Sequence, residues 1–188
     1  MPLLQVIVAS TRPGRVGRPV AEWFAAEAER HGDFEVELVD LAEVDLPLFD
    51  EPKHPRLQEY EHDHTRRWSE TISRGDAFAF VMPEYNFGYN AALKNAIDFL
   101  WREWNDKPVA LVGYGGVSGG LRAMTVLKPV LTAVRLQYVA EVPIPFVHDI
   151  VQDGAVEANE PMRKGVAGAL DALPRAIRLR DAAAAGQS

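Results

Sequence analysis

The chain has 188 residues, of which 47% are hydrophobic and 25% charged, the composition of a soluble globular protein that forms one domain with a sizeable core. Its net charge of −7 argues against nucleic acid or an acidic membrane surface as a partner, because both require a basic face on the protein. The absence of cysteine excludes disulfides, thiolate chemistry and cysteine metal ligands.

The amino terminus has neither the basic segment nor the apolar run of a signal peptide, so we expect none. No stretch of the chain approaches 18 consecutive apolar residues, so we expect no membrane span. Together with the lack of cysteine, these features favour a cytoplasmic protein.

Hydrophobic periodicity predicts strands that alternate with helices along the chain. In the first half it predicts a buried strand at 3–9, a helix at 16–30, a half-exposed strand at 34–41, an irregular proline-containing connection at 43–58 and a helix at 65–74 with Trp68 and Ile72 facing inward. In the second half it predicts a strand at 77–82, a helix at 91–104, a strand at 108–113, a helix at 119–134, a strand at 136–142 and a helix at 160–180.

Three local features refine this pattern. Pro129 falls inside the helix at 119–134, where its missing N–H and its ring predict a break or kink. The alanine-rich tail from about residue 181 is expected to be frayed. The helix at 91–104 is apolar over a wide arc, which predicts burial against the sheet and also against a second subunit.

Strands that alternate with helices indicate a parallel sheet with helices on both faces. The handedness of parallel crossovers leaves few possible topologies. We predict a single domain over residues 1–188 with a flavodoxin-like, doubly wound, five-stranded sheet in the order 2-1-3-4-5.

The loop after the first predicted strand reads Ser10-Thr11-Arg12-Pro13-Gly14-Arg15-Val16-Gly17. It leads into a helix, whose first N–H groups and dipole favour an anion. The arginines add charge-assisted hydrogen bonds, and the glycines allow the backbone to come close to a ligand. We predict a phosphate site formed by Ser10, Arg12, Arg15, Val16 and Gly17.

Two alternatives exist for this loop. One is a solvated loop with a serine cap. The other is a dinucleotide site, in which Asp40 at the end of the second strand binds a ribose. The loop holds only Gly14-x-x-Gly17 instead of G-x-G-x-x-G, and its hydroxyl groups suit a terminal phosphate better than a pyrophosphate. Asp40 is therefore interpreted as a strand-end or solvated acid.

The loop after the third predicted strand reads Met82-Pro83-Glu84-Tyr85-Asn86-Phe87-Gly88. It follows a strand at the carboxyl edge, where open α/β sheets bind ligands. Pro83 stiffens the turn, and Glu84, Tyr85 and Asn86 offer backbone N–H groups and an aromatic plane. Together with the helix segment Leu93-Lys94-Asn95-Ala96-Ile97-Asp98, this loop resembles the NADPH-dependent FMN reductase family, whose central loop reads close to Pro-Glu-Tyr-Asn.

The loop after the fourth predicted strand holds five glycines in Gly113-Tyr114-Gly115-Gly116-Val117-Ser118-Gly119-Gly120. Glycines at a strand end allow close backbone approach to a planar ligand. Ser118 is interpreted as a helix cap or as a donor to the pyrimidine edge of a flavin. A flexible loop without a ligand is the alternative, but three such loops follow strands whose ends lie side by side in a doubly wound sheet. We add Gly115, Gly116, Ser118 and Gly119 to the predicted site.

The resemblance covers about residues 3–145 and implies FMN as the cofactor. It implies that the phosphate lies in the 10–17 loop and that the flavin ring lies between the 83–88 and 113–120 loops. It also implies a homodimer that sometimes assembles into a tetramer, with the helix after the central loop at a subunit interface. Val16-Gly17 stands where some relatives carry another hydroxyl group.

Other chemistries find little support in the sequence. His62-Asp63-His64 invites a metal site, but residues two apart do not share a helix face, and no third ligand lies nearby. Gly115-Gly116-Val117-Ser118-Gly119 does not have the register of a nucleophile elbow, so a hydrolase is not expected.

The predicted function is an NAD(P)H-dependent flavin reductase, or a related quinone, azo or metal-ion reductase. NADPH or NADH gives a hydride to flavin N5, and the reduced flavin passes electrons to a small acceptor such as a flavin or quinone. The flavin carries this chemistry, so no side-chain acid or base and no metal is required. A flavodoxin-like electron carrier and an FMN-binding module without turnover are the alternatives.

Overall fold

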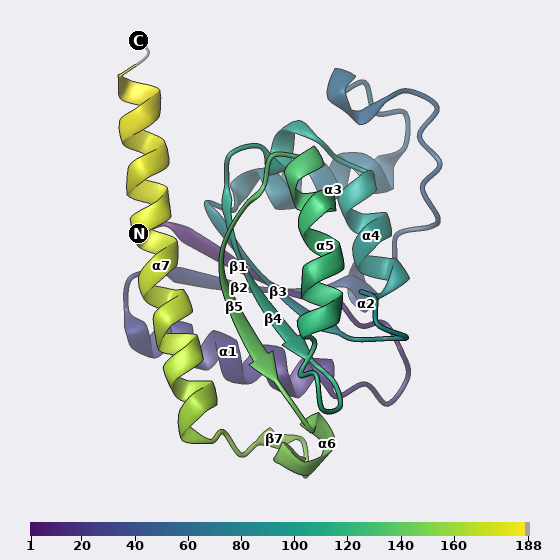
Figure 1. Ribbon diagram of the computed structural model, residues 1–188. Coiled ribbons are helices and arrows are strands. Elements are labelled where there is room, and N and C mark those ends of the chain that lie inside the picture. The colour runs from purple at the N-terminus through teal and green to yellow at the C-terminus, as the bar shows by residue number, and fades with distance from the viewer. Residues whose placement is uncertain (187–188) are drawn as a thin grey trace.

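A five-stranded parallel sheet lies at the centre of the computed structural model, which describes residues 1–186 (Figure 1). The order along the sheet is β2-β1-β3-β4-β5, so the predicted flavodoxin-like topology is confirmed. The strands are β1 (Leu3–Val8), β2 (Glu35–Asp40), β3 (Ala77–Pro83), β4 (Pro108–Tyr114) and β5 (Gln137–Ile144).

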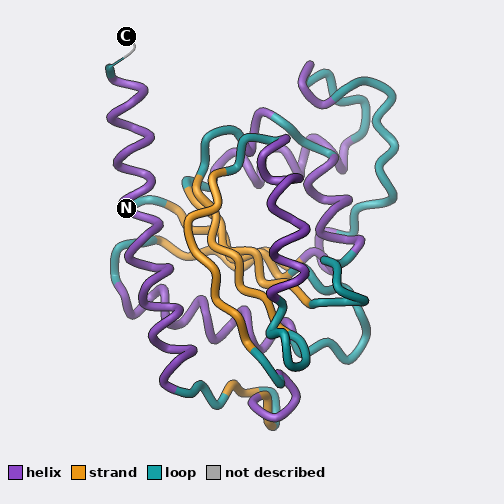
Figure 2. Tube along the Cα trace, viewed as in Figure 1, coloured by secondary structure: helices purple, strands orange, loops and turns teal. Residues whose placement is uncertain are grey.

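Helices cover both faces of this sheet (Figure 2). On one face lie α1 (Gly17–His31) and α7 (Glu160–Ala185), and on the other lie α3 (Asp63–Arg74), α4 (Ala91–Asp98) and α5 (Leu121–Ala133). The connections contain α2 (Leu41–Val44), η1 (Pro55–Leu57), η2 (Arg102–Trp104), α6 (Val147–Ile150) and a small hairpin of β6 (Val151–Gln152) and β7 (Ala155–Val156). Within residues 1–186, no helix is long and apolar enough to cross a membrane.

The sheet separates two hydrophobic cores because alternate residues of a strand point to opposite faces. In β3, Ala79 and Val81 pack with α1 and α7, whereas Phe78 and Phe80 pack with α3 and α4. Every residue of β3 and β4 is buried, which explains why these strands read as continuous apolar runs. Trp68 and Ile72 of α3 are buried in the second core, as their spacing predicts.

The predicted helix at 91–104 is wrong in its second half. Helix α4 ends at Asp98, and the chain then passes through Phe99 and Leu100 into η2. This change of path turns Phe99, Leu100 and Trp104 into the core of the same chain, where they are 0–1% exposed. The apolar residues of 91–104 are therefore buried largely within one subunit, and their pattern no longer argues for a second subunit.

Of the break or kink predicted at Pro129, the break is wrong, since α5 continues from Leu121 to Ala133. Pro129 lies on the exposed side of the helix. The carbonyl that loses its N–H partner there, that of Thr125, belongs to another exposed residue, so water can replace the missing donor. Helix α7 reaches Ala185, beyond the start of the expected frayed tail, and residues 187–188 of that tail lie outside the described part of the chain.

A buried carboxylate fixes the long connection between α2 and α3. Glu103 of η2 is 4% exposed and accepts hydrogen bonds from Tyr60 Oη (2.8 Å), Ser69 Oγ (2.6 Å) and the Trp101 N–H (3.3 Å). Burial, and then the bond to this carboxylate, raises the pKa of Tyr60 well above its ordinary value. One side chain thus holds the connection, α3 and η2 together.

We expect Glu103→Ala to lower the free energy of unfolding by about 2–3 kcal/mol, because it leaves several buried donors without an acceptor. Urea denaturation measures the change. Glu29→Ala, which replaces an exposed glutamate of α1, is the matched control and should stay within about 0.5 kcal/mol of the wild type. Equal stabilities of the two variants would contradict this role of Glu103.

Candidate functional site

The loops that follow β1, β3 and β4 meet at the carboxyl edge of the sheet, at the lower right of Figure 1. They enclose a cavity of about 250 Å³. Its lining includes nine of the predicted site residues, Ser10, Arg12, Arg15, Val16, Pro83, Glu84, Tyr85, Gly115 and Gly116. The other four predicted residues, Gly17, Asn86, Ser118 and Gly119, belong to the same loops but do not line the cavity.

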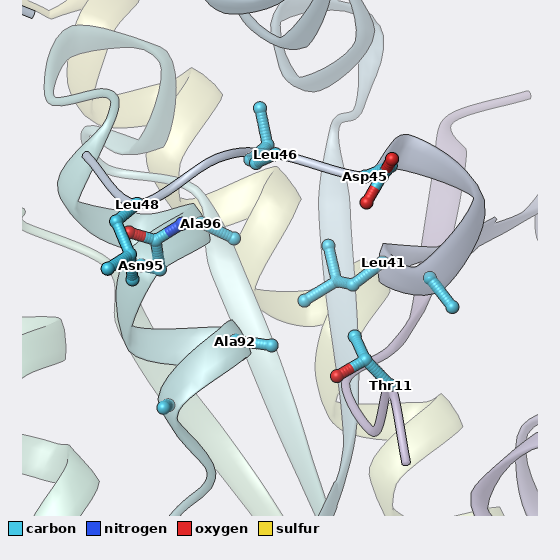
Figure 3. A pocket seen from close by; sticks show the side chains of 10 residues that line it. Thr11, Leu41, Asp45, Leu46, Leu48, Ala92, Asn95 and Ala96 are labelled. Carbon is cyan, nitrogen blue, oxygen red and sulfur yellow. The ribbon is translucent and has the colours of Figure 1, made fainter. Parts of the chain in front are cut away.

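A second, larger hollow of about 350 Å³ lies between α2 and α4 (Figure 3). Thr11 lines it, but neither the loop after β3 nor the loop after β4 contributes a residue. Its most polar side chain on α4, Asn95, is already bonded to the backbone of Pro47 and Phe49. We therefore place the candidate site in the smaller cavity, where the three loops converge.

The start of α1 presents free hydrogen-bond donors to this cavity. Its N-cap residue, Val16, makes no side-chain capping bond, and the first turn holds no acidic residue. The side chain of Ser10 is 3.1 Å from the hydroxyl of Tyr85, which links the first loop to the second. An uncapped helix start of this kind attracts an anion, because its N–H groups and dipole are left uncompensated.

The two arginines of the first loop differ in their surroundings. Arg15 forms an ion pair with Asp40 (2.5 Å), and Arg18 of α1 reaches the same carboxylate (3.0 Å). Asp40 also caps α2 by accepting the N–H of Ala42. Arg12, in contrast, is exposed and has no ion pair within residues 1–186. Arg12 is therefore the cation of this loop that remains available to a ligand.

Tyr114, at the end of β4, is a cavity residue that our sequence analysis did not select. Its side chain is 4% exposed, and its hydroxyl lies close to that of Ser10 without forming a hydrogen bond of regular geometry among the described residues. Burial raises its pKa above the ordinary value. The hydroxyl occupies the space beside Gly17, where an added Cβ would lie only 2.3 Å from it. Gly17 thus makes room for Tyr114.

The second loop forms a tight turn at the edge of the cavity. Tyr85 and Gly88 exchange two backbone hydrogen bonds of 2.9 Å, and the two residues between them, Asn86 and Phe87, have φ angles of 49° and 67°. Such a turn points its central N–H groups outward, and those of Asn86 and Phe87 have no partner within residues 1–186. Tyr85 provides the aromatic wall that the sequence predicts.

Glu84 joins the second loop to the third. Its carboxylate accepts the hydroxyl of Ser118 (2.7 Å) and the N–H of Arg122 (3.1 Å), so it caps α5 from a different loop. Burial opposes ionisation, but the bonds from Ser118, Ala123 and Arg122 prevail and lower the pKa of Glu84. The hydroxyl proton of Ser118 is consequently directed to Glu84.

The glycines of the third loop have two different roles. Gly119 has a φ of +59°, and a Cβ there would lie 2.9 Å from the backbone nitrogen of Pro145. It therefore packs the loop against the end of β5. Gly116 faces open space, with no atom within 4 Å of an added Cβ. Val147 and His148 of α6 complete the lining. They lie beyond residue 145, where the family resemblance ends, and outside the three loops from which the site was predicted.

The histidine pair lies away from this cavity. His62 precedes α3 and has an extended backbone. Its ring therefore stacks on that of His64, with 5.1 Å between the ring centres, whereas two residues of a helix at this spacing would lie on different faces. His64 bonds to Asp50 at 2.9 Å. Within residues 1–186 there is no group of three or more side chains arranged to hold a metal ion.

A doubly wound sheet with three converging loops and an uncapped helix start is the arrangement in which α/β proteins typically bind phosphorylated ligands, at the switch between strands. The model of the family described as NADPH-dependent FMN reductase matches residues 2–149. The chain therefore belongs to the NADPH-dependent FMN reductase family. This confirms the predicted flavin oxidoreductase with FMN and NAD(P)H as cofactors.

Individual relatives agree with this assignment. The chain is 32% identical to NAD(P)H-dependent FMN reductase ntnL of Nectria sp over 190 residues, which cover 94% of each protein. It is 42% identical to NAD(P)H-dependent FMN reductase C4B3.06c of Schizosaccharomyces pombe over 121 residues, 63% of this chain and 60% of that protein. The structure of the flavoenzyme FerB of Paracoccus denitrificans, an NAD(P)H:(acceptor) oxidoreductase, superposes with a TM-score of 0.77 at 28% identity, over 96% of this chain and 99% of that one. More distant matches are named as azoreductases and quinone oxidoreductases.

We expect Arg12→Ala to weaken FMN binding by about 1–3 kcal/mol, the range for the loss of a hydrogen bond to a charged group. Arg15→Ala should weaken it less, because that guanidinium is already paired with Asp40. Titration of the apoprotein with FMN measures both effects. Arg178→Ala is the control, since this arginine lines a hollow near the first residues of the chain, at the opposite edge of the sheet. Unchanged affinity in both Arg12→Ala and Ser10→Ala would exclude the phosphate site.

Proposed function

We propose that the cavity formed by the three loops binds FMN, with the phosphate at the start of α1 and the flavin ring between the loops after β3 and β4. Three observations support the fit. The uncapped start of α1 and the unpaired Arg12 suit a phosphate. The free N–H groups of Asn86 and Phe87 suit the polar edge of a ring, and Gly116 leaves open space for its plane. The hydroxyl of Tyr114 is a buried polar atom of the lining that lies beside Ser10 and makes no hydrogen bond of regular geometry.

When bound, FMN supplies the redox chemistry, accepting a hydride from NADPH or NADH and delivering two electrons to an acceptor. The chain holds and orients the reactants. Tyr85 and Pro83 form one wall of the cavity, and the third loop forms the other. The Glu84 carboxylate is engaged by Ser118 and the start of α5, so it serves to join these walls. No side chain of the lining is required as a general acid or base.

The acceptor is a small molecule that reaches the same exposed side of the ring as the nicotinamide. Relatives named as azoreductases and quinone oxidoreductases support an azo or quinone acceptor, and the family description supports a free flavin. One site that receives donor and acceptor in turn gives ping-pong kinetics.

We also propose a homodimer, with a tetramer as a further state, in the cytoplasm. The support for assembly is an exposed face at the second hollow, whose lining includes Ala91 and Ala92 of α4 and Leu48, which is 84% exposed. Figure 3 shows Leu48 beside Asn95 of α4. The connection that carries Leu48 is stiffened by Pro47, Pro52 and Pro55. Asn95 also anchors it by donating a hydrogen bond to the carbonyl of Pro47. A face of this kind is suited to a second copy of the chain.

The convergence of the three loops on one cavity carries the proposal, and the visible spectrum of the purified protein tests it. We expect a flavin spectrum that bleaches on addition of NADPH without oxygen and returns on addition of a quinone. Double-reciprocal plots at several quinone concentrations should give parallel lines. FMN that NADPH fails to bleach would instead indicate an electron carrier.

We expect Gly116→Val to reduce the flavin content or the turnover while the protein stays folded. Gly116 has no left-handed φ angle, so the effect should come from a branched side chain that fills the open space of the cavity. Gly168→Val, on α7 with equally open surroundings, is the matched control for adding this side chain. Tyr85→Ala should cost about 1 kcal/mol of flavin affinity through lost aromatic contact. Full flavin content and rates in both Gly116→Val and Tyr85→Ala would place the ring elsewhere.

A further inference from the structure

Phe87 occupies an unusual position in the turn after β3. Its φ angle of 67° lies in the left-handed region, where a bulky side chain is an outlier that costs of the order of 1 kcal/mol or more. Its side chain gains little burial in return, since 65% of it is exposed. Neither local backbone preference nor core packing explains a phenylalanine there. Strained residues of this kind concentrate at ligand sites.

The ring of Phe87 is nevertheless held in place. The guanidinium of Arg122 lies over one face of it, 4.2 Å from the ring centre. Arg122 is in turn fixed by Glu84, whose carboxylate accepts hydrogen bonds from the backbone N–H of Arg122 (3.1 Å) and from its guanidinium Nη1 (3.3 Å). A stack on arginine covers one face of the ring and leaves the exposed area on the opposite face and the edges. Phe87 is thus an oriented aromatic surface.

This surface lies beside the cavity, because Glu84 both lines the cavity and anchors Arg122. Two apolar side chains of the third loop and α5, Val117 and Leu121, are also exposed, at 72% and 45%. Glu84 neutralises the charge of Arg122, so the surface offers aromatic and apolar contact with little net charge. The unpaired Arg12, which favours phosphates, belongs to the first loop. These features suit an uncharged planar ring better than a phosphorylated nucleotide.

We propose that Phe87, backed by Arg122, is the docking surface for the planar electron acceptor, a neutral quinone-type ring, and that it determines acceptor specificity. The inference rests on the proposed flavin site, because an acceptor has to lie next to the ring that reduces it. A second copy of the chain is the other possible occupant of the exposed ring. The N–H groups of Asn86 and Phe87 have no partner within residues 1–186, so an apolar subunit interface over this turn would bury them without an acceptor.

Two variants separate the aromatic ring from the shape of the turn. Phe87→Asn removes the ring but places at this position a residue that tolerates the left-handed region well, so the turn is retained. Phe87→Tyr keeps the ring. In a ping-pong reaction, kcat/KM for NADPH reports only the first half-reaction and kcat/KM for the quinone only the second. With 2-methyl-1,4-naphthoquinone we expect Phe87→Asn to lower kcat/KM for the quinone about fivefold, the effect of one aromatic stack. The value for NADPH should change less than about twofold, and Phe87→Tyr should keep both values close to those of the wild type.

A binding measurement provides a readout that does not depend on turnover. The same quinone is titrated by calorimetry into the oxidised, FMN-loaded protein without NADPH, and Phe87→Asn should bind it about fivefold more weakly than the wild type. An equal loss in kcat/KM for NADPH, a loss of FMN affinity, or a change from dimer to monomer in sedimentation would each overturn the proposal. Unchanged quinone binding would overturn it as well. Failure of the proposed function has a different signature, since the wild type itself would then bind no FMN or fail to oxidise NADPH.

Discussion

The parallel sheet imposes the constraint on which the rest of this structure depends. Parallel strands require every connection to cross from the carboxyl edge back to the amino edge, so all loops that leave a strand gather on one side. In this chain β1, β3 and β4 are the three central strands, and both of their faces are covered by helices. The loops that leave these strands therefore bring accessible backbone together at this edge, which is where the cavity lies.

Pairing of charges then determines what each loop can offer. Arg15 and Arg18 neutralise Asp40, which is almost completely buried, and this leaves Arg12 as the available cation of the first loop. Glu84 is satisfied by Ser118 and by the start of α5, so it acts as a brace between the second and third loops. These pairings remove most side-chain charge from the cavity, and they leave backbone N–H groups as its principal donors. A flavin enzyme needs such placement more than it needs an acid or base.

The hydrogen bonds of Glu84 also stabilise the fold at the carboxyl edge of the sheet. Glu84 is distant from α5 in the sequence, yet its carboxylate caps the start of that helix. The N-cap residue itself is Gly120, which has no side chain to make such a bond. On the same face of the sheet as α5, Glu103 holds the long connection before α3 in the same manner, with one buried carboxylate shared by several donors. In both places the chain uses a buried acid to fix a loop, because a fully bonded carboxylate costs little while an incomplete set of bonds is expensive.

Much of this architecture follows from the sequence alone. The continuous apolar runs of β3 and β4, the helical spacing between strands and the residues Pro83 to Asn86 are local signals, and they determined the fold, the family and the location of the three loops. Nine of the thirteen predicted site residues line the cavity because the carboxyl ends of the central strands have to meet. Pattern and topology suffice for such features, since they depend on periods of two and 3.6 residues.

Only the tertiary structure decided the rest. The change of path after Asp98, the continuity of α5 through Pro129, the partner of Ser118 and the place of Tyr114 beside Gly17 all depend on contacts between segments far apart in the chain. Local preference is worth about 1 kcal/mol per residue, and burial of a large side chain such as Phe99 outweighs it. The φ angle of Phe87 and its stack on Arg122 belong to the same class, because both come from the packing of the turn against α5. Sequence patterns record which residues prefer a structure, whereas the packed chain decides which of those preferences are satisfied.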